Sequence, residues 1–164
     1  YGLVMKSLDK MLYSVSENIA ILTINRPERR NALDAETLEQ INILMDKAEH
    51  DEKVRVILIH GNGDTFSSGF DLKDQMEKDP QGEQWKPILE LDYQTIMRFW
   101  KSPKPTIAAV KGACLAGAFE LSLACDLTIC SRDSFFGEPE LKFGAGIVTM
   151  IILKLMRLLQ GHLQ

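Results

Sequence analysis

The chain has few features that would direct it to a membrane, to secretion or to disulfide chemistry. Its 164 residues contain no apolar run long enough to span a bilayer, no N-x-S/T sequon and no secretory-type apolar stretch near its first residue, Tyr1. Cysteine is scarce, and the three that occur lack C-x-x-C spacing. They sit in apolar segments, which predicts buried, reduced thiols at Cys114, Cys125 and Cys130. We expect a protein of the cytoplasm or of an organelle matrix.

Several common site patterns are also missing. There is no G-x-S-x-G turn, so no serine is a good candidate for an activated nucleophile. The glycine pair of Gly61-Asn62-Gly63 lacks the third glycine of a dinucleotide fingerprint, because Phe66 stands there. No metal site is expected, because the three histidines have no ligand spacing: His50, His60 and His162.

The charge balance argues against a nucleic-acid or membrane partner. The formal net charge is −4 and the isoelectric point is near 5.4, whereas surfaces for nucleic acid or anionic lipid are basic. The composition, 45% hydrophobic and 26% charged, is that of an ordinary globular domain. We expect residues 1–164 to form a single domain.

The hydrophobic pattern alternates between buried strands and amphipathic helices, with Asp34 as a helix N-cap. This order predicts an α/β fold with crossover connections. A polar loop or frayed helix is expected over 73–87, and an apolar helix from Gly144 onward. The expected strands are Met11–Ser16, Asn18–Asn25, Val54–His60, Thr106–Val110 and Leu127–Ser131, and the expected helices are Asp34–His50, Ile88–Trp100 and Gly117–Ala124.

Two glycine turns are the most informative feature of the chain. Phe66–Asp71 and Cys114–Glu120 each follow an expected strand and each open an expected helix. A glycine in such a turn is often required only for its backbone conformation. Two of them, however, place two backbone N–H groups at helix mouths, where a developing oxyanion can bind.

Two glutamates accompany these turns. Glu120 lies three residues beyond Gly117 in an otherwise apolar segment, and Glu140 follows Pro139 in a stiff loop. Each has a simpler interpretation: Glu120 complements a helix dipole, and Glu140 is a solvated loop acid. Together with an oxyanion clamp, they favour acyl or enolate chemistry.

These residues resemble a known family. The segments Ile24–Leu33, Phe66–Leu72, Ile107–Asp126 and Phe136–Leu141 are similar, in this order and spacing, to the enoyl-CoA hydratase/isomerase (crotonase) superfamily. The resemblance implies an α/β spiral of ββα units, in which helices surround two roughly perpendicular sheets. It also implies assembly as a homotrimer or hexamer. The family normally continues into a C-terminal helical region, so residues 1–164 are expected to be the core domain without that region.

The same resemblance implies the site. The backbone amides of Ser68 and Gly117 would form the oxyanion hole for a CoA thioester, and Glu120 and Glu140 would activate water and supply a proton. Coenzyme A would enter as part of an acyl-CoA substrate, with no bound cofactor. Arg29 or Arg30 is expected to bind a phosphate of coenzyme A. The residues expected to contact the substrate are Arg26, Glu28, Arg30, Ala32, Phe66, Gly69, Phe70, Asp71, Leu72 and Ala116.

The chain departs from the family pattern in two places. Phe70 stands where a small residue is common, and it is expected to narrow or cover the acyl site. The stretch Ile147–Met150 is bulkier than the usual glycine-rich one. The leading interpretation is hydration of an enoyl-CoA. The alternatives are isomerisation, thioester hydrolysis or decarboxylation in the same oxyanion hole, and an inactive CoA-binding subunit.

Overall fold

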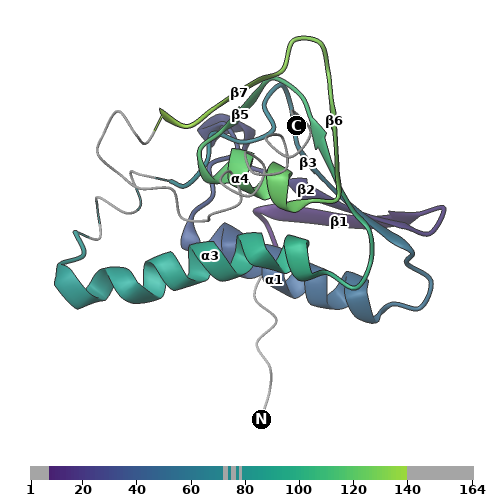
Figure 1. The fold of residues 1–164 in the computed structure, drawn as a ribbon, viewed down its shortest axis with the longest axis horizontal. Helices are drawn as coiled ribbons and strands as arrows, with labels where there is room; N and C mark the ends of the chain where they lie inside the picture. Colours follow the sequence, from purple (N-terminus) through teal and green to yellow (C-terminus); the bar gives the residue numbers. More distant parts are fainter. Residues whose placement is uncertain (1–7, 72–73, 75–76, 78, 140–164) are drawn as a thin grey trace, which may run out of the picture.

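A five-stranded sheet forms the centre of the molecule (Figure 1), in the order β1-β2-β3-β4-β6. The computed structural model describes residues 8–71, 74, 77 and 79–139. β1 and β2 are antiparallel, whereas β3, β4 and β6 follow in parallel. The strands are β1 (Met11–Ser16), β2 (Ile19–Ile24), β3 (Val56–Gly61), β4 (Thr106–Val110) and β6 (Leu127–Cys130).

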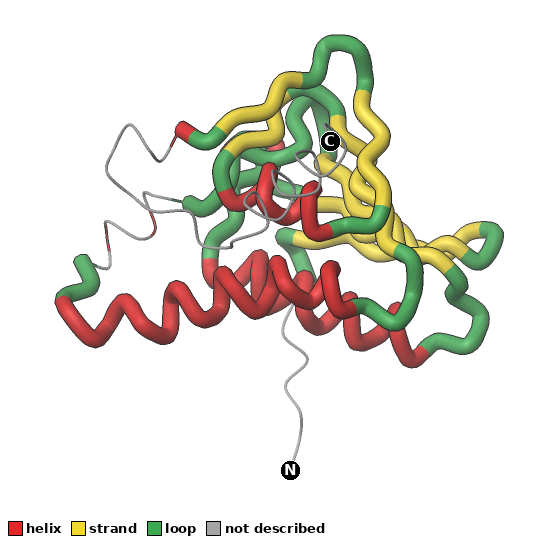
Figure 2. The backbone as a smooth tube through the Cα atoms, in the orientation of Figure 1, coloured by secondary structure: helices red, strands yellow, loops and turns green. Residues whose placement is uncertain are grey.

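Two long helices pack side by side, and the first of them also packs against β1 and β2. They are α1 (Ala35–His50) and α3 (Trp85–Lys101), and Figure 2 shows both on the same side of the strands. Leu38, Ile41 and Met45 of α1 recur at helical spacing and are fully buried. Each large side chain buried in this way contributes about 1.5–3 kcal/mol to folding.

The start of α1 is fixed by its N-cap. The Asp34 carboxylate accepts hydrogen bonds from the Thr37 N–H at 2.8 Å and the Thr37 hydroxyl at 2.7 Å. Such a cap contributes about 1 kcal/mol. The sequence prediction of this helix and its cap is confirmed.

A second, two-stranded sheet lies beside α4 (Gly117–Ala124). Its strands β5 (Ala113–Leu115) and β7 (Phe135–Gly137) pair in parallel. Neither strand was predicted: the second was expected to be part of a stiff loop. Three residues are too few to display a period, so only their partner shows that they are strands.

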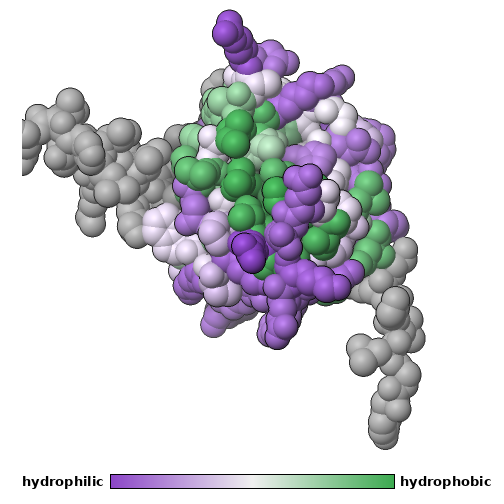
Figure 3. All heavy atoms as spheres, turned by 90° about the vertical axis from the view of Figure 1, so that its right-hand side faces the viewer, coloured by the Kyte–Doolittle hydropathy of each residue, from purple (hydrophilic) through white to green (hydrophobic). Residues whose placement is uncertain are grey.

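The last strand of the main sheet is exposed. Leu127 and Ile129 of β6 are 60% and 61% exposed. Figure 3, which views the molecule from the side where β6 lies in Figure 1, shows apolar side chains gathered among polar ones. Cys130, at the end of β6, is exposed rather than buried as predicted, because β6 is an edge strand. Cys114 and Cys125 are buried, as predicted.

The described residues at the end of the segment predicted as a polar loop or frayed helix, 73–87, have regular structure. A 3-10 turn spans Gly82–Gln84, and α3 begins at Trp85 rather than at Ile88. Pro87 therefore lies inside the helix, in the first turn, where a missing N–H costs no intrahelical bond. The helix expected from Gly144 lies outside the described residues.

The α/β fold class is confirmed, with two sheets and flanking helices in the predicted crossover order. Among the described residues, no helix is long and apolar enough to cross a membrane.

Candidate active site

The two glycine turns are in direct contact. Gly69 has φ +91°, and a Cβ built on it would lie 2.5 Å from the Ala116 Cβ and 3.3 Å from the Gly117 backbone nitrogen. Ser67 and Cys114, which precede these contact residues in the two turns, form a parallel β-bridge. The second turn follows β5 directly, whereas the first is separated from β3 by a loop. Segments far apart in the sequence therefore meet at one point, as the oxyanion interpretation requires.

Gly117 presents a helix-terminal N–H group. It is the first residue of α4, and its N–H makes no hydrogen bond with another described residue. The preceding residue, Ala116, has φ +56°, a conformation that non-glycine residues seldom adopt. Its carbonyl accepts the N–H groups of Phe119 and Glu120. The Gly117 N–H therefore remains a donor, aided by the helix dipole.

Ser68 differs from Gly117. Its N–H donates to the Arg30 carbonyl at 3.0 Å, whereas the Gly117 N–H has no hydrogen-bond partner among the described residues. Arg30 and Asn31 are both left-handed, with φ +52° and +54°. The Asn31 side chain, fully buried, donates to the Thr65 carbonyl at 2.7 Å and holds this turn in place. Any further acceptor at the Ser68 N–H would compete with the Arg30 carbonyl.

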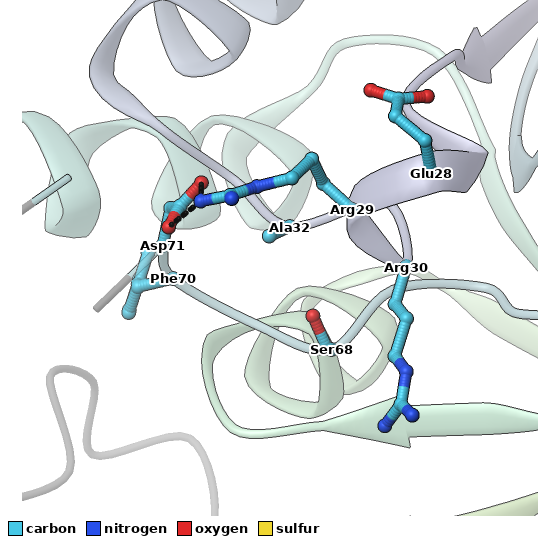
Figure 4. Close-up of a pocket in the computed structure, with 7 residues that line it drawn as sticks. All are labelled: Glu28, Arg29, Arg30, Ala32, Ser68, Phe70 and Asp71. Carbon is cyan, nitrogen blue, oxygen red and sulfur yellow. Dashed lines mark hydrogen bonds and ion pairs between the residues drawn. The ribbon is translucent and has the colours of Figure 1, made fainter. Parts of the chain in front are cut away.

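The Phe70 ring lies against Gly117. A Cβ built on Gly117 would lie 2.3–2.7 Å from three atoms of the ring. Phe70 also lines a cavity of about 480 Å³, which Figure 4 shows. This position agrees with the expectation that Phe70 narrows the site. The residues that line the cavity are Glu28, Arg29, Arg30, Ala32, Ser68, Phe70 and Asp71.

Arg26 and Asp71 hold the wall of this cavity together. Arg26 is largely buried and pairs with Asp71 at 3.2 Å and with Asp34 at 3.1 Å. Burial opposes ionisation of Asp71, but the Asp74 N–H and the Arg29 and Arg26 guanidinium groups outweigh it and keep its pKa below the ordinary value. Both residues are thus occupied in shaping the site.

Two exposed arginines border the cavity. Arg29 reaches Asp71 at 3.2 Å, whereas Arg30 points away from it and makes no ion pair with a described residue (Figure 4). Both follow Pro27 and Glu28 in a polar turn that begins with a 3-10 helix, Pro27–Arg29. Arg30 is therefore the guanidinium available to an anion.

Of the remaining residues predicted to contact the substrate, one lies at the cavity wall and one in the hydrophobic core. Ala32 is buried at the cavity wall. Phe66 belongs to the hydrophobic core and is 1% exposed, so its side chain anchors the turn in the core and is not among the residues that line the cavity. Leu72 and Glu140 lie outside the described residues.

Glu120 is more deeply buried than the other described acids of the site. It is 1% exposed and lies on α4, one turn beyond Gly117. Its neighbours Ala118 and Leu121 pack in the core and fix the helix. A carboxylate so deeply placed costs several kcal/mol unless it has a partner or a function.

A further buried acid, Asp92, was not predicted. It lies on α3, is 3% exposed, and its Oδ2 has no hydrogen-bond partner in the described part of the chain. Burial, and secondarily the negative charge of Glu120, raise the pKa of Asp92 to about 7. The signal was present in the sequence, because Asp92 shares a helical face with Ile96 and Phe99.

Asp92 predicts a pH-dependent stability. Its folded pKa lies above the ordinary value of 3.8, so the folded state holds this proton more tightly, and stability falls as pH rises from about 4 to about 7. Asp92→Asn removes this dependence. As pH rises from about 5 to about 8, the free energy of unfolding of the variant should increase by about 2–3 kcal/mol relative to that of the unmodified protein. Urea unfolding of the full-length chain at each pH measures this difference.

The control for this prediction is Asp133→Asn, because Asp133 is exposed and its pKa is not raised. Parallel stability curves for Asp92→Asn and the unmodified protein, at all pH values, would contradict the assignment of a raised pKa.

The two buried thiols are protonated at neutral pH and therefore unreactive. Burial raises the pKa of Cys114 and of Cys125 to about 12, so neither is a thiolate at neutral pH. In the described part of the chain, no group of His, Cys, Asp and Glu residues is arranged to hold a metal ion.

Comparisons with known proteins agree on one family. A family model described as enoyl-CoA hydratase/isomerase matches residues 14–159. A probable enoyl-CoA hydratase of Bacillus subtilis (strain 168) is 39% identical over 131 residues, which are 80% of this chain and 50% of that protein.

Solved structures give the same result. An enoyl-CoA hydratase/isomerase from Xanthobacter autotrophicus Py2 is 60% identical, with a TM-score of 0.86 over 87% of this chain and 54% of that one. A putative enoyl-CoA hydratase/isomerase (crotonase) from Legionella pneumophila is 33% identical, with a TM-score of 0.84 over 90% and 58%. The chain spans about half the length of these relatives. Since the family model covers most of the sequence and the fold matches, this chain belongs to the enoyl-CoA hydratase/isomerase (crotonase) superfamily.

Proposed function

We propose that the whole protein is a hydratase that adds water across the α,β double bond of an enoyl-CoA. The observation that carries this proposal is the contact between the two turns: Gly69 packs on Ala116 and Gly117, and the buried Glu120 lies one helical turn away. The names of the relatives, enoyl-CoA hydratase and enoyl-CoA hydratase/isomerase, point to the same chemistry.

The Gly117 N–H would stabilise the oxygen of the thioester carbonyl. Attack of water at the β-carbon pushes electrons onto this oxygen and gives an enolate. A preorganised backbone donor stabilises that charge by about 3–4 kcal/mol. Ser68 would supply the second donor once the Arg30 carbonyl has moved, which couples substrate binding to the Arg26–Ala32 turn.

Glu120 would take part in the proton transfers. Hydration adds a hydroxyl to the β-carbon and a proton to the α-carbon, so one group must accept a proton from water and one must deliver a proton to carbon. We propose Glu120 and Glu140 for these two roles. General acid–base help of this kind contributes roughly 10²–10⁴-fold to the rate.

The large cavity would hold part of the coenzyme A moiety. Its exposed Arg30 has no ion pair with a described residue, and a guanidinium group binds phosphate oxygens well. The salt bridges of Arg26 and Arg29 to Asp71 keep the opposite wall in place.

The test is hydration of crotonyl-CoA by the full-length protein, followed by the loss of the enoyl absorbance. We expect turnover and a 3-hydroxyacyl-CoA as product. A shifted double bond would indicate an isomerase, free CoA a thioesterase, and loss of CO₂ from a carboxylated thioester a decarboxylase. Tight binding of acetoacetyl-CoA without turnover of any thioester would instead indicate a CoA-binding subunit. Each of these four results would contradict the hydratase proposal.

A further inference from the structure

A second cavity, of about 280 Å³, lies between the N-terminal parts of α1 and α3. Apolar side chains and carboxyl groups line it together, and among its described lining residues there is no lysine or arginine. Asp71 lines both this cavity and the large one. The lining residues are Leu33, Asp34, Ala35, Glu39, Asp71, Asp74, Pro87, Ile88, Leu91 and Asp92.

Asp92 differs from the other carboxyl groups of this cavity. Asp34 pairs with Lys10 and Arg26, and Asp71 pairs with two arginines. Asp92 is 3% exposed and has neither an ion pair nor a hydrogen bond to a described residue. A buried carboxyl without a hydrogen bond is costly, so the free protein lacks a group that Asp92 is able to bind.

A dipole role does not account for Asp92. It lies in the middle of α3, which runs from Trp85 to Lys101, whereas a helix dipole favours an acid only in the first turn. α3 packs against α4, and Asp92 lies close enough to Glu120 of α4 for the charge of Glu120 to act on it. Glu120 is one turn from the Gly117 N–H.

Under the proposed function, the acyl group would follow this order in space. A thioester carbonyl at Gly117 would place its next carbons beside Glu120, and carbons further along the chain beside Asp92 and the small cavity. Leu33, Ile88 and Leu91 supply apolar walls for the methylene groups there.

We propose that Asp92 selects an acyl group that carries a hydrogen-bond donor, a hydroxyl or an ammonium, beyond the reacting carbons. The proposal rests on the CoA-thioester function proposed above. A donor on the acyl chain would bind the Asp92 carboxyl, whereas a plain alkyl chain would leave that carboxyl buried and unpaired. Sites built to bind a polar substituent reject analogues that lack it for this reason.

The experiment compares three saturated thioesters, which cannot be hydrated: hexanoyl-CoA, 6-hydroxyhexanoyl-CoA and 6-aminohexanoyl-CoA. Their dissociation constants for the full-length protein are measured by calorimetry. We expect at least one of the two polar thioesters to bind about 10-fold or more tightly than hexanoyl-CoA. The hydroxyl and ammonium arms identify which donor is preferred.

Three variants connect this preference to Asp92. Asp92→Leu should abolish the preference for a polar thioester or favour hexanoyl-CoA. Asp92→Asn keeps the shape of the side chain, so it serves if the Asp92→Leu variant does not fold. It should abolish any preference for the ammonium. Glu39→Gln removes an exposed carboxyl from the same cavity and should leave the preference intact.

Two results would overturn the inference alone: equal affinities for all three thioesters, or a preference that persists in both Asp92 variants. Failure of every thioester to bind, including hexanoyl-CoA, would overturn the proposed function together with the inference. The two failures are therefore distinguishable.

Discussion

Replacement of Glu120 by Gln is expected to lower kcat for crotonyl-CoA hydration by about 10²–10⁴-fold, the contribution of a positioned acid or base. Gln has almost the same shape as Glu but neither takes up nor releases a proton at neutral pH. Because Glu120 is 1% exposed and packed in the α3–α4 interface, water is poorly placed to substitute for it. The enoyl absorbance of the full-length variant gives the rate.

The matched control for this variant is Glu52→Gln, which makes the same chemical change at an exposed position after α1. Calorimetric binding of acetoacetyl-CoA should change little in Glu120→Gln, so the loss should appear in kcat rather than in affinity. A variant with the unmodified kcat would remove Glu120 from the mechanism.

The same substitution has a consequence at Asp92. Loss of the Glu120 charge removes one of the two causes that raise the pKa of Asp92, although burial, the larger cause, remains. The pH at which stability falls should therefore move downward, but not to the ordinary range of an aspartate. The two carboxyl groups thus form one electrostatic unit across the α3–α4 contact.

Local signals were sufficient for most of the main sheet and for the long helices. β4 was predicted residue for residue, because Thr106–Val110 is an apolar run bounded by Pro105 and Lys111. α1 was predicted from its cap and its 3.6-residue period. In both cases the information lies within a few neighbouring residues.

The details of the site depend on partners that are distant in sequence. The hydrogen bond from Ser68 to Arg30 joins residues 38 positions apart, by their numbering, and no local pattern indicates it. β5 and β7 are defined by their pairing rather than by their composition. Asp92 was missed for a different reason: its place on the apolar face of α3 follows from helical spacing, but an acidic side chain on a helix is usually exposed rather than buried.

The contact between the turns gives the second large prediction. Gly69→Ala is expected to lower kcat/KM for crotonyl-CoA by about 10²–10³-fold, the effect of losing one oxyanion donor. The added methyl would lie 2.5 Å from the Ala116 Cβ and 2.8 Å from the Leu115 carbonyl oxygen. Real atoms do not approach so closely, so the turns must separate, and the Ser68 and Gly117 N–H groups separate with them.

Gly69→Ala also forces alanine into a left-handed conformation, a cost that must be measured separately. Gly63→Ala supplies that measurement: Gly63 has φ +82°, close to the +91° of Gly69, but the nearest atom to its added methyl is the Pro27 Cβ at an ordinary 3.6 Å. Both variants should lose about 1–2 kcal/mol of stability from backbone strain, and only Gly69→Ala should also lose catalysis.

The ratio of kcat/KM between the two variants isolates the effect of moving the turns apart, because the backbone penalty is common to both. A displacement of about 1 Å in a catalytic group is enough to cost on the order of 10²-fold. If Gly69→Ala were as active as Gly63→Ala, the separation of Ser68 and Gly117 would not matter to the reaction. The thioester oxygen would then have to bind elsewhere than between these two turns.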